Sequence, residues 1–133
     1  MNFTCTITVF GKNFDPNQFI NTIPIKIDKV VYKGQRRHNL PNSKIINYSF
    51  VSFEINSKNF RQSSFSEYIE DLVMYLKQNE KILIQINSLS EIEYYNLELF
   101  IKSDNEKIER FYFSNDFINI CSNLKVSIET VLI

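Results

Sequence analysis

The sequence predicts a single α+β domain over residues 1–133, a two-layer sandwich whose antiparallel sheet carries helices on one face. Three observations favour this class. Residues 3–9 alternate apolar and polar side chains, the period of a half-buried strand, and residues 65–76 place apolar side chains at steps of three and four, the period of an amphipathic helix. A short Asn-rich, Phe-Ile pattern at 17–21 returns at 115–119. If that repeat is real, two strand-helix-strand halves give a ferredoxin-like plan.

Length and composition also fit one folded domain. The chain has 133 residues, 44% of them hydrophobic, with two glycines and three prolines. Fifteen basic side chains balance fifteen acidic ones, so no global field attracts nucleic acid, which argues against nucleic acid as a partner. The chain shows neither a secretory signal nor an apolar run of membrane-spanning length, so we expect a cytoplasmic protein without a membrane partner.

The chain begins with a strand and a short helix. Residues 3–9 form the strand, its threonines face the open side of the sheet, and Gly11 ends it. Asp15 suits the N-cap and Pro16 the first helical position, because a proline there loses no hydrogen bond. We expect the helix to end before Pro24.

The next segments are a short extended piece at 25–31, an exposed polar loop at 33–43 and a strand at 45–55. In the strand, the apolar phase changes partway, so that both faces carry apolar side chains. A β-bulge near Phe50 and Val51 is the simplest explanation.

The longest helix begins at Ser64, which forms a capping box with Glu67. Residues 81–92 fit a strand by the alternation of Ile82, Ile84 and Ile86, but their apolar side chains also fit a helix. Both readings stay open on the pattern alone.

The last third of the chain predicts a hairpin, a helix and a final strand. Residues 94–101 alternate as a strand, 103–105 suit a turn, and 108–113 would return as the hairpin partner. Ser114 or Asn115 then caps a short helix, and residues 126–132 form a closing strand.

The residues do not announce a chemistry. His38, the sole histidine, lies in a polar loop, and Cys5 and Cys121 lack the companion ligands of a zinc site, so both are expected to be buried free thiols. The adjacent carboxylates Glu70 and Asp71 fall on the solvent side of a helix. We therefore predict no catalytic, metal or cofactor-binding residues and a protein that is not an enzyme.

The most suggestive polar cluster is basic and lies in the loop after the second extended piece: Lys33, Arg36, Arg37 and His38. Such a cluster can bind carboxylates or phosphates, because arginine presents a planar fork of donors. An ordinary exposed turn is the favoured explanation, because the loop itself has no aromatic side chain of the kind that binds single-stranded nucleic acid by stacking.

Several short motifs carry a resemblance. Phe14-Asp15-Pro16 after the first strand, Lys33-Gly34, and Phe113-Ser114 before the last helix resemble a bacterial family of small stand-alone domains of unknown function. Its middle strand often starts with tryptophan, where this chain has Tyr48. Some members lie in polymorphic toxin loci, and the family layout favours a helix at 81–92.

The resemblance implies a non-catalytic immunity protein, monomeric or homodimeric, that binds and neutralises a cognate toxin domain. It supplies no catalytic residues. The alternative is a small-molecule or phosphate-binding module that uses the loop at 33–38, and a third possibility is a nucleic-acid binder that uses an open face of the sheet.

Overall fold

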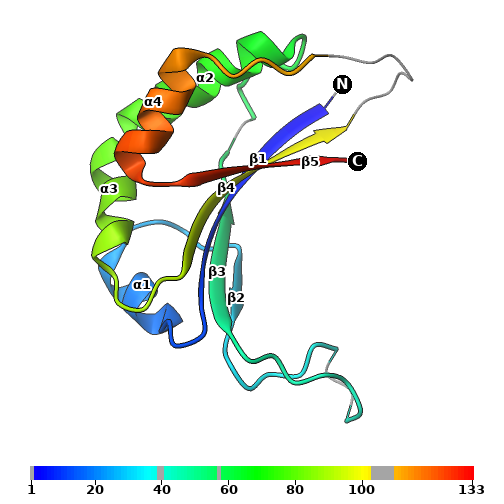
Figure 1. Ribbon diagram of the computed structural model, residues 1–133, viewed down its shortest axis with the longest axis vertical. Coiled ribbons are helices and arrows are strands. Elements are labelled where there is room, and N and C mark those ends of the chain that lie inside the picture. Colours follow the sequence, from blue (N-terminus) through cyan, green and yellow to red (C-terminus); the bar gives the residue numbers. More distant parts are fainter. Residues whose placement is uncertain (1, 39–40, 57, 103–109) are drawn as a thin grey trace.

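The computed structural model of the protein describes residues 2–38, 41–56, 58–102 and 110–133, and it confirms the α+β, two-layer prediction. The strands form one sheet in the order β2-β3-β1-β4-β5, and the helices lie on one side of it (Figure 1). The strands are β1 (Asn2–Gly11), β2 (Lys29–Val31), β3 (Ser49–Glu54), β4 (Tyr94–Lys102) and β5 (Ser127–Leu132). The helices are α1 (Pro16–Thr22), α2 (Phe65–Gln78), α3 (Glu80–Gln85), the 3-10 turn η1 (Ile86–Ser88) and α4 (Asn115–Leu124).

The first four strands have the ferredoxin-like arrangement. β1 is antiparallel to both β3 and β4, and β2 is antiparallel to β3. Consequently β1 and β2 run parallel with β3 between them, and β3 and β4 run parallel with β1 between them. These are two split strand-helix-strand units, β1-α1-β2 and β3-α2-β4. The second unit is therefore not the one that contains the sequence repeat at 115–119.

β5 corrects the prediction of a wholly antiparallel sheet. It pairs parallel to β4, from Asn96 opposite Ser127 to Ile101 opposite Leu132. Helix α4 lies between the two strands in the chain and forms the crossover that parallel neighbours require. The closing strand was predicted from its alternating apolar and polar side chains. This alternation is the same in parallel and antiparallel strands, so it does not reveal the direction of pairing.

The predicted hairpin partner at 108–113 is not a strand over the residues that the structure describes. Residues 110–113 form no strand, and 103–109 lie outside the described residues. Phe111 and Phe113 instead pack edge-on against Phe65 of α2, with ring centroids 5.1 and 5.7 Å away. Their apolar spacing therefore reflects packing on the helix layer.

The predicted bulge in β3 is also wrong. Residues Thr6–Gly11 of β1 face Glu54–Ser49 of β3 one to one, without an extra residue. Val51 and Phe53 are buried against the helices, while Phe50 lies on the opposite, open face. Both faces of this strand are apolar because the open face carries aromatic rings.

Local sequence signals set the helix starts. The Asp15 carboxylate accepts a hydrogen bond from the Asn17 N–H, and the Ser64 hydroxyl accepts one from the Glu67 N–H. Residues 81–92, which fitted either structure, contain α3 from its second residue onward and all of η1, so the helical reading is the correct one.

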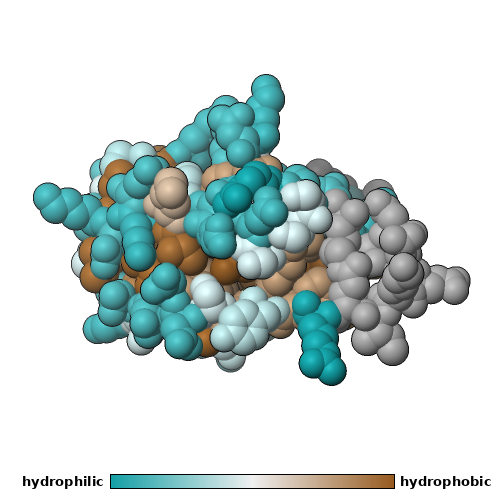
Figure 2. All heavy atoms as spheres, turned by 90° about the horizontal axis from the view of Figure 1, so that it is seen from above, coloured by the Kyte–Doolittle hydropathy of each residue, from teal (hydrophilic) through white to brown (hydrophobic). Residues whose placement is uncertain are grey.

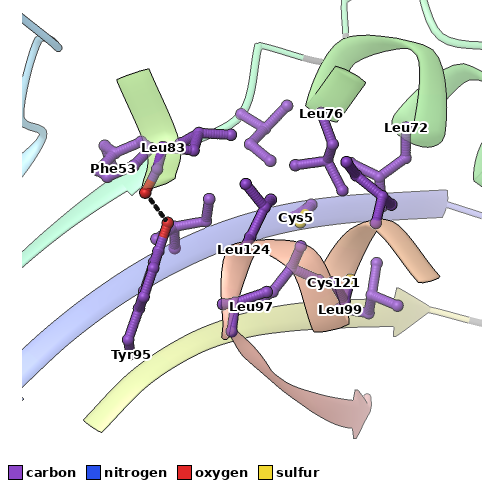
Figure 3. Packing of buried hydrophobic residues seen from close by; sticks show 14 of the residues in the cluster. Cys5, Phe53, Leu72, Leu76, Leu83, Tyr95, Leu97, Leu99, Cys121 and Leu124 are labelled. Atoms are coloured by element: carbon purple, nitrogen blue, oxygen red, sulfur yellow. Dashed lines mark hydrogen bonds between the residues drawn. The ribbon is translucent and has the colours of Figure 1, made fainter. Parts of the chain in front are cut away.

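The core fills the space between the sheet and the helices (Figure 3). The Tyr95 hydroxyl donates a 2.8 Å hydrogen bond to the Leu83 carbonyl, which joins β4 to α3. Cys5 and Cys121 are buried free thiols, as predicted. Burial raises the pKa of Cys121 to about 12 and that of Cys5 well above its ordinary value, so both thiols stay protonated at neutral pH.

The outer surface is largely polar at the end of the molecule where α2 and α4 lie. Figure 2 shows this end, with apolar side chains visible between polar ones. No described helix is long and apolar enough to cross a membrane.

Candidate functional site

In the loop between β2 and β3, the described residues 32–38 and 41–48 form an extension of the sheet, and we call them the basic arm (Figure 1). A bridge joins Arg36 to Ile45, and the Gly34 N–H donates to the Ile46 carbonyl at 2.8 Å. Gly34 has a φ of 95°, a conformation that side chains other than glycine's rarely adopt. The Lys33-Gly34 motif therefore has a structural reason.

The base of the basic arm is tied to the rest of the molecule. The Tyr32 hydroxyl donates to the Asn17 side-chain carbonyl at 2.9 Å, which links the arm to α1. The Lys33 N–H donates to the hydroxyl of buried Ser49 at 2.8 Å. These contacts fix the position of the arm beside the end of β3.

Four aromatic rings lie on the open face of the sheet next to the basic arm, and we call them the aromatic row: Phe10, Tyr48, Phe50 and Tyr94. Phe10 of β1 lies opposite both Phe50 of β3 and Tyr94 of β4, so the row crosses three adjacent strands. Ring centroids lie 4.6 Å apart for Phe10 and Tyr48, 5.5 Å for Phe10 and Tyr94, and 6.1 Å for Tyr48 and Phe50. Tyr94 is 57% exposed.

Three rings of the aromatic row, those of Phe10, Tyr48 and Phe50, line a shallow, open groove of about 360 Å³. The ammonium of Lys29 lies 5.6 Å from the centroid of the Phe50 ring, within range of a cation–π contact. Polar side chains complete the groove: Thr6, Thr8, Ser52 and Glu98.

A smaller hollow of about 90 Å³ lies on the basic arm, where Arg37 and Lys44 face Tyr48. Tyr48 lines both hollows, so the groove continues onto the arm. Of the predicted site residues, Arg37 lines the smaller hollow. Lys33, Arg36 and His38 are exposed on the arm but line neither.

Glu98 is the acidic group of the groove. Burial raises its pKa, and the charge of Glu129 adds to that effect, whereas a hydrogen bond from the Thr8 hydroxyl opposes it. A half-buried carboxylate of this kind is a strong acceptor for N–H donors of a ligand.

Charge is unevenly distributed along the chain. Residues 29–53, which contain β2, the basic arm and most of β3, hold five of the fifteen basic side chains and none of the fifteen acidic ones. The balanced total therefore hides a strongly positive region that borders the aromatic row.

The sequence pointed to the arm but missed the row. The available signal was the apolar pattern on both sides of 45–55, together with Phe10 and Tyr94, whose positions in their strands alternate with those of the core residues. Recognising a row also requires the strand order, which places β1 between β3 and β4.

The arrangement can bind by stacking, hydrogen bonding and charge. Within the described ranges no group of three His, Cys, Asp or Glu side chains is placed to hold a metal ion. His38 is exposed, and both cysteines are buried away from the groove.

Comparison with known proteins gives a family and no characterised relative. No curated protein and no solved structure matches the chain. Residues 1–132 match a family described as "Domain of unknown function (DUF4279)". This agrees with the resemblance to a family of unknown function, while the association with toxins stays a prediction. Because the match covers nearly the whole sequence, the chain belongs to the DUF4279 family.

Proposed function

We propose that the protein is a non-catalytic binding protein that neutralises a cognate toxin domain by covering it with the aromatic row and the basic arm. The observation that carries the proposal is the exposed row beside a cationic arm. Tyrosine and arginine dominate the binding energy of many protein interfaces, and here both types lie on one surface. The resemblance to domains found near toxin genes supports the choice of partner.

The charge of the arm sets an expectation for the partner. A stable interface of ordinary size covers about 800 Å² on each side, so a toxin that covers the row also reaches the arm. Five basic side chains and no acidic ones in residues 29–53 then favour an acidic surface on the toxin.

Co-expression tests this proposal. If a gene beside this one encodes a toxin domain, cells that produce that domain should grow when the wild-type protein is present, and the two proteins should co-purify. Tyr94→Ala should weaken the complex at least tenfold, because Tyr94 is the exposed ring of the row. Tyr112→Ala is the matched control, since Tyr112 is a 75% exposed tyrosine outside the row. Failure to form a complex or restore growth would count against toxin neutralisation.

A second candidate function is the binding of a small phosphate ligand at the basic arm. Two observations favour phosphate binding. Arg37 and Lys44 line the same small hollow, and residues 29–53 contain no carboxylate that would compete for these cations. Pyrophosphate at a hundred times its Kd should stabilise the fold by about 2.7 kcal/mol in thermal unfolding. The shift should shrink in Arg37→Ala and persist in Lys77→Ala, since Lys77 lies in the last turn of α2 and lines neither hollow. An unchanged melting temperature at millimolar pyrophosphate would contradict this function.

A further inference from the structure

We propose that the open face binds single-stranded nucleic acid, with bases stacked on the aromatic row and phosphates held by the basic arm. The inference rests on the second candidate function, because it extends phosphate binding at the arm to a polymer. Two features of the sequence argued against nucleic acid: the balanced charge of the whole chain and the lack of rings in the loop. The fold removes both objections, since it places four rings beside an acid-free basic segment.

The first step is stacking. Tyr94, Phe10 and Phe50 are cross-strand neighbours, so their rings follow one another across β4, β1 and β3 at one end of the sheet. One common RNA-binding module uses aromatic rings on the face of a four-stranded sheet to stack two or three bases of single-stranded RNA. Base stacking tolerates sequence changes, because every base has a π-face.

The second step concerns the base edges. Next to the row, the groove offers hydroxyl groups from Thr6, Thr8 and Ser52 and the carboxylate of Glu98. A carboxylate accepts hydrogen bonds from exocyclic amino groups such as that of cytosine, and hydroxyl groups can donate or accept. A base stacked on Phe10 therefore has polar partners in the same groove.

The third step concerns the phosphates. Lys29 lies over the Phe50 ring, and Arg37 and Lys44 line the hollow that Tyr48 joins to the groove. These cations lie beside the row and on the arm, so they are placed to contact phosphates of a strand whose bases occupy the groove. A duplex cannot use the row, because its bases are already stacked and paired.

Fluorescence anisotropy with labelled twelve-nucleotide oligo(U), oligo(dT), oligo(C) and a duplex of equal length tests the proposal. We expect binding of the single strands at least tenfold tighter than that of the duplex. Preference for oligo(U) over oligo(dT) distinguishes RNA from DNA as the source of the ligand. With three to five cations engaged, log K should fall against log salt with a slope of about −2 to −3.5.

The variants separate stacking from charge. Tyr94→Ala should weaken binding about 5- to 150-fold with little change in the salt slope. Arg37→Ala should make the slope of log K against log salt less negative by about 0.7, and this change should be the same for every oligonucleotide sequence. Tyr112→Ala should bind as wild type does, because Tyr112 lies outside the row. Circular dichroism of each variant verifies the fold.

Three results would overturn the proposal: no binding of any single strand at 50 mM salt, equal affinity for the duplex, or equal losses in Tyr94→Ala and Tyr112→Ala. Stabilisation by pyrophosphate without oligonucleotide binding would overturn the nucleic-acid inference and leave the phosphate candidate standing. A toxin complex that depends on Tyr94, formed by a protein that binds no oligonucleotide, would assign the open face to a protein partner.

Discussion

The carboxylate of Glu98 is partly buried and lies near a second carboxylate, that of Glu129. It lies on the open face of β4, opposite Glu129 of the parallel strand β5. Burial raises its pKa, the charge of Glu129 raises it further, and the Thr8 hydroxyl stabilises the ionised form only in part. The ionised side chain therefore costs the folded state some of its stability.

This environment predicts how stability changes with pH. Because the folded pKa of Glu98 lies above its unfolded value, the folded state binds the proton more tightly, and the favourable contribution is present below the unfolded pKa. It is lost as the pH rises through the folded pKa. Glu98→Gln should match wild type near pH 3 and become the more stable protein above the folded pKa. Urea unfolding between pH 3 and 8 measures the difference, and a variant that is less stable at pH 7 would contradict the sign.

Single residues were predictable where their partners are close in sequence. Asp15 and Ser64 cap helices through N–H groups two and three residues later, so the cap motifs identify them. Gly11 was expected only to end a strand. In the structure a β-carbon there would clash with the Glu91 carbonyl oxygen, a contact that no local pattern reveals.

Arg61 shows the same limit for ion pairs. The solvent-facing Glu70 and Asp71 were predicted, but Arg61 binds both of them from the preceding loop, with N···O distances of 3.0 Å. Hydrogen bonds from Arg61 lower the pKa of Asp71. The pairing depends on how the loop approaches the helix, which charge alone does not determine.

At the level of elements, α2 depends on its first turn. The Ser64 hydroxyl accepts the Glu67 N–H at 3.1 Å, and the helix then buries Phe65, Tyr68 and Leu72 on the core side. Ser64→Ala should destabilise the protein by about 1 kcal/mol, because one N–H loses its acceptor. Ser66→Ala, at an exposed position within α2, should be neutral or slightly stabilising. Guanidinium unfolding compares the two, and equal effects would show that the cap is not responsible.

The elements that the pattern left open were decided by packing. Segment 81–92 has β-branched residues that suit a strand, yet the structure buries Leu83, Ile86 and Leu89 and exposes Ile84, which fits helical spacing. In β3, apolar residues on both faces were attributed to a bulge, whereas the second face belongs to the aromatic row. The spacing of apolar residues identifies which face of a strand or helix is apolar, but it does not identify the residues that pack against that face.

At the level of the whole molecule, the ferredoxin-like order of the first four strands and the later addition of β5 determine what the open face presents. The order brings Phe10, Phe50 and Tyr94 together from three separate stretches of the sequence. The two-layer class followed from the alternation and the amphipathic helix. The strand order, the parallel direction of β5 and the row required long-range pairing that single-sequence patterns do not encode.

The same order predicts how stability is distributed over the sheet. β1 is paired along its length with β4 and over Thr6–Gly11 with β3, whereas β2 is a three-residue strand paired with β3 alone. Opening β1 disrupts pairing on both sides and exposes buried residues such as Cys5 and Ile7, so its amides should exchange only through global unfolding. β2 can separate while the core stays intact.

Native-state hydrogen exchange in increasing denaturant tests this distribution. Amides of β1 should converge on the free energy and denaturant dependence of global unfolding, while those of β2 should exchange through local opening with little denaturant dependence. The amides of α2 provide an internal control for cooperative unfolding, since this helix buries six residues in the core. If Val30 and Val31 were as protected as Ile7, the β2 edge would belong to the cooperative core, and the basic arm that follows it would be anchored more firmly than its pairing implies.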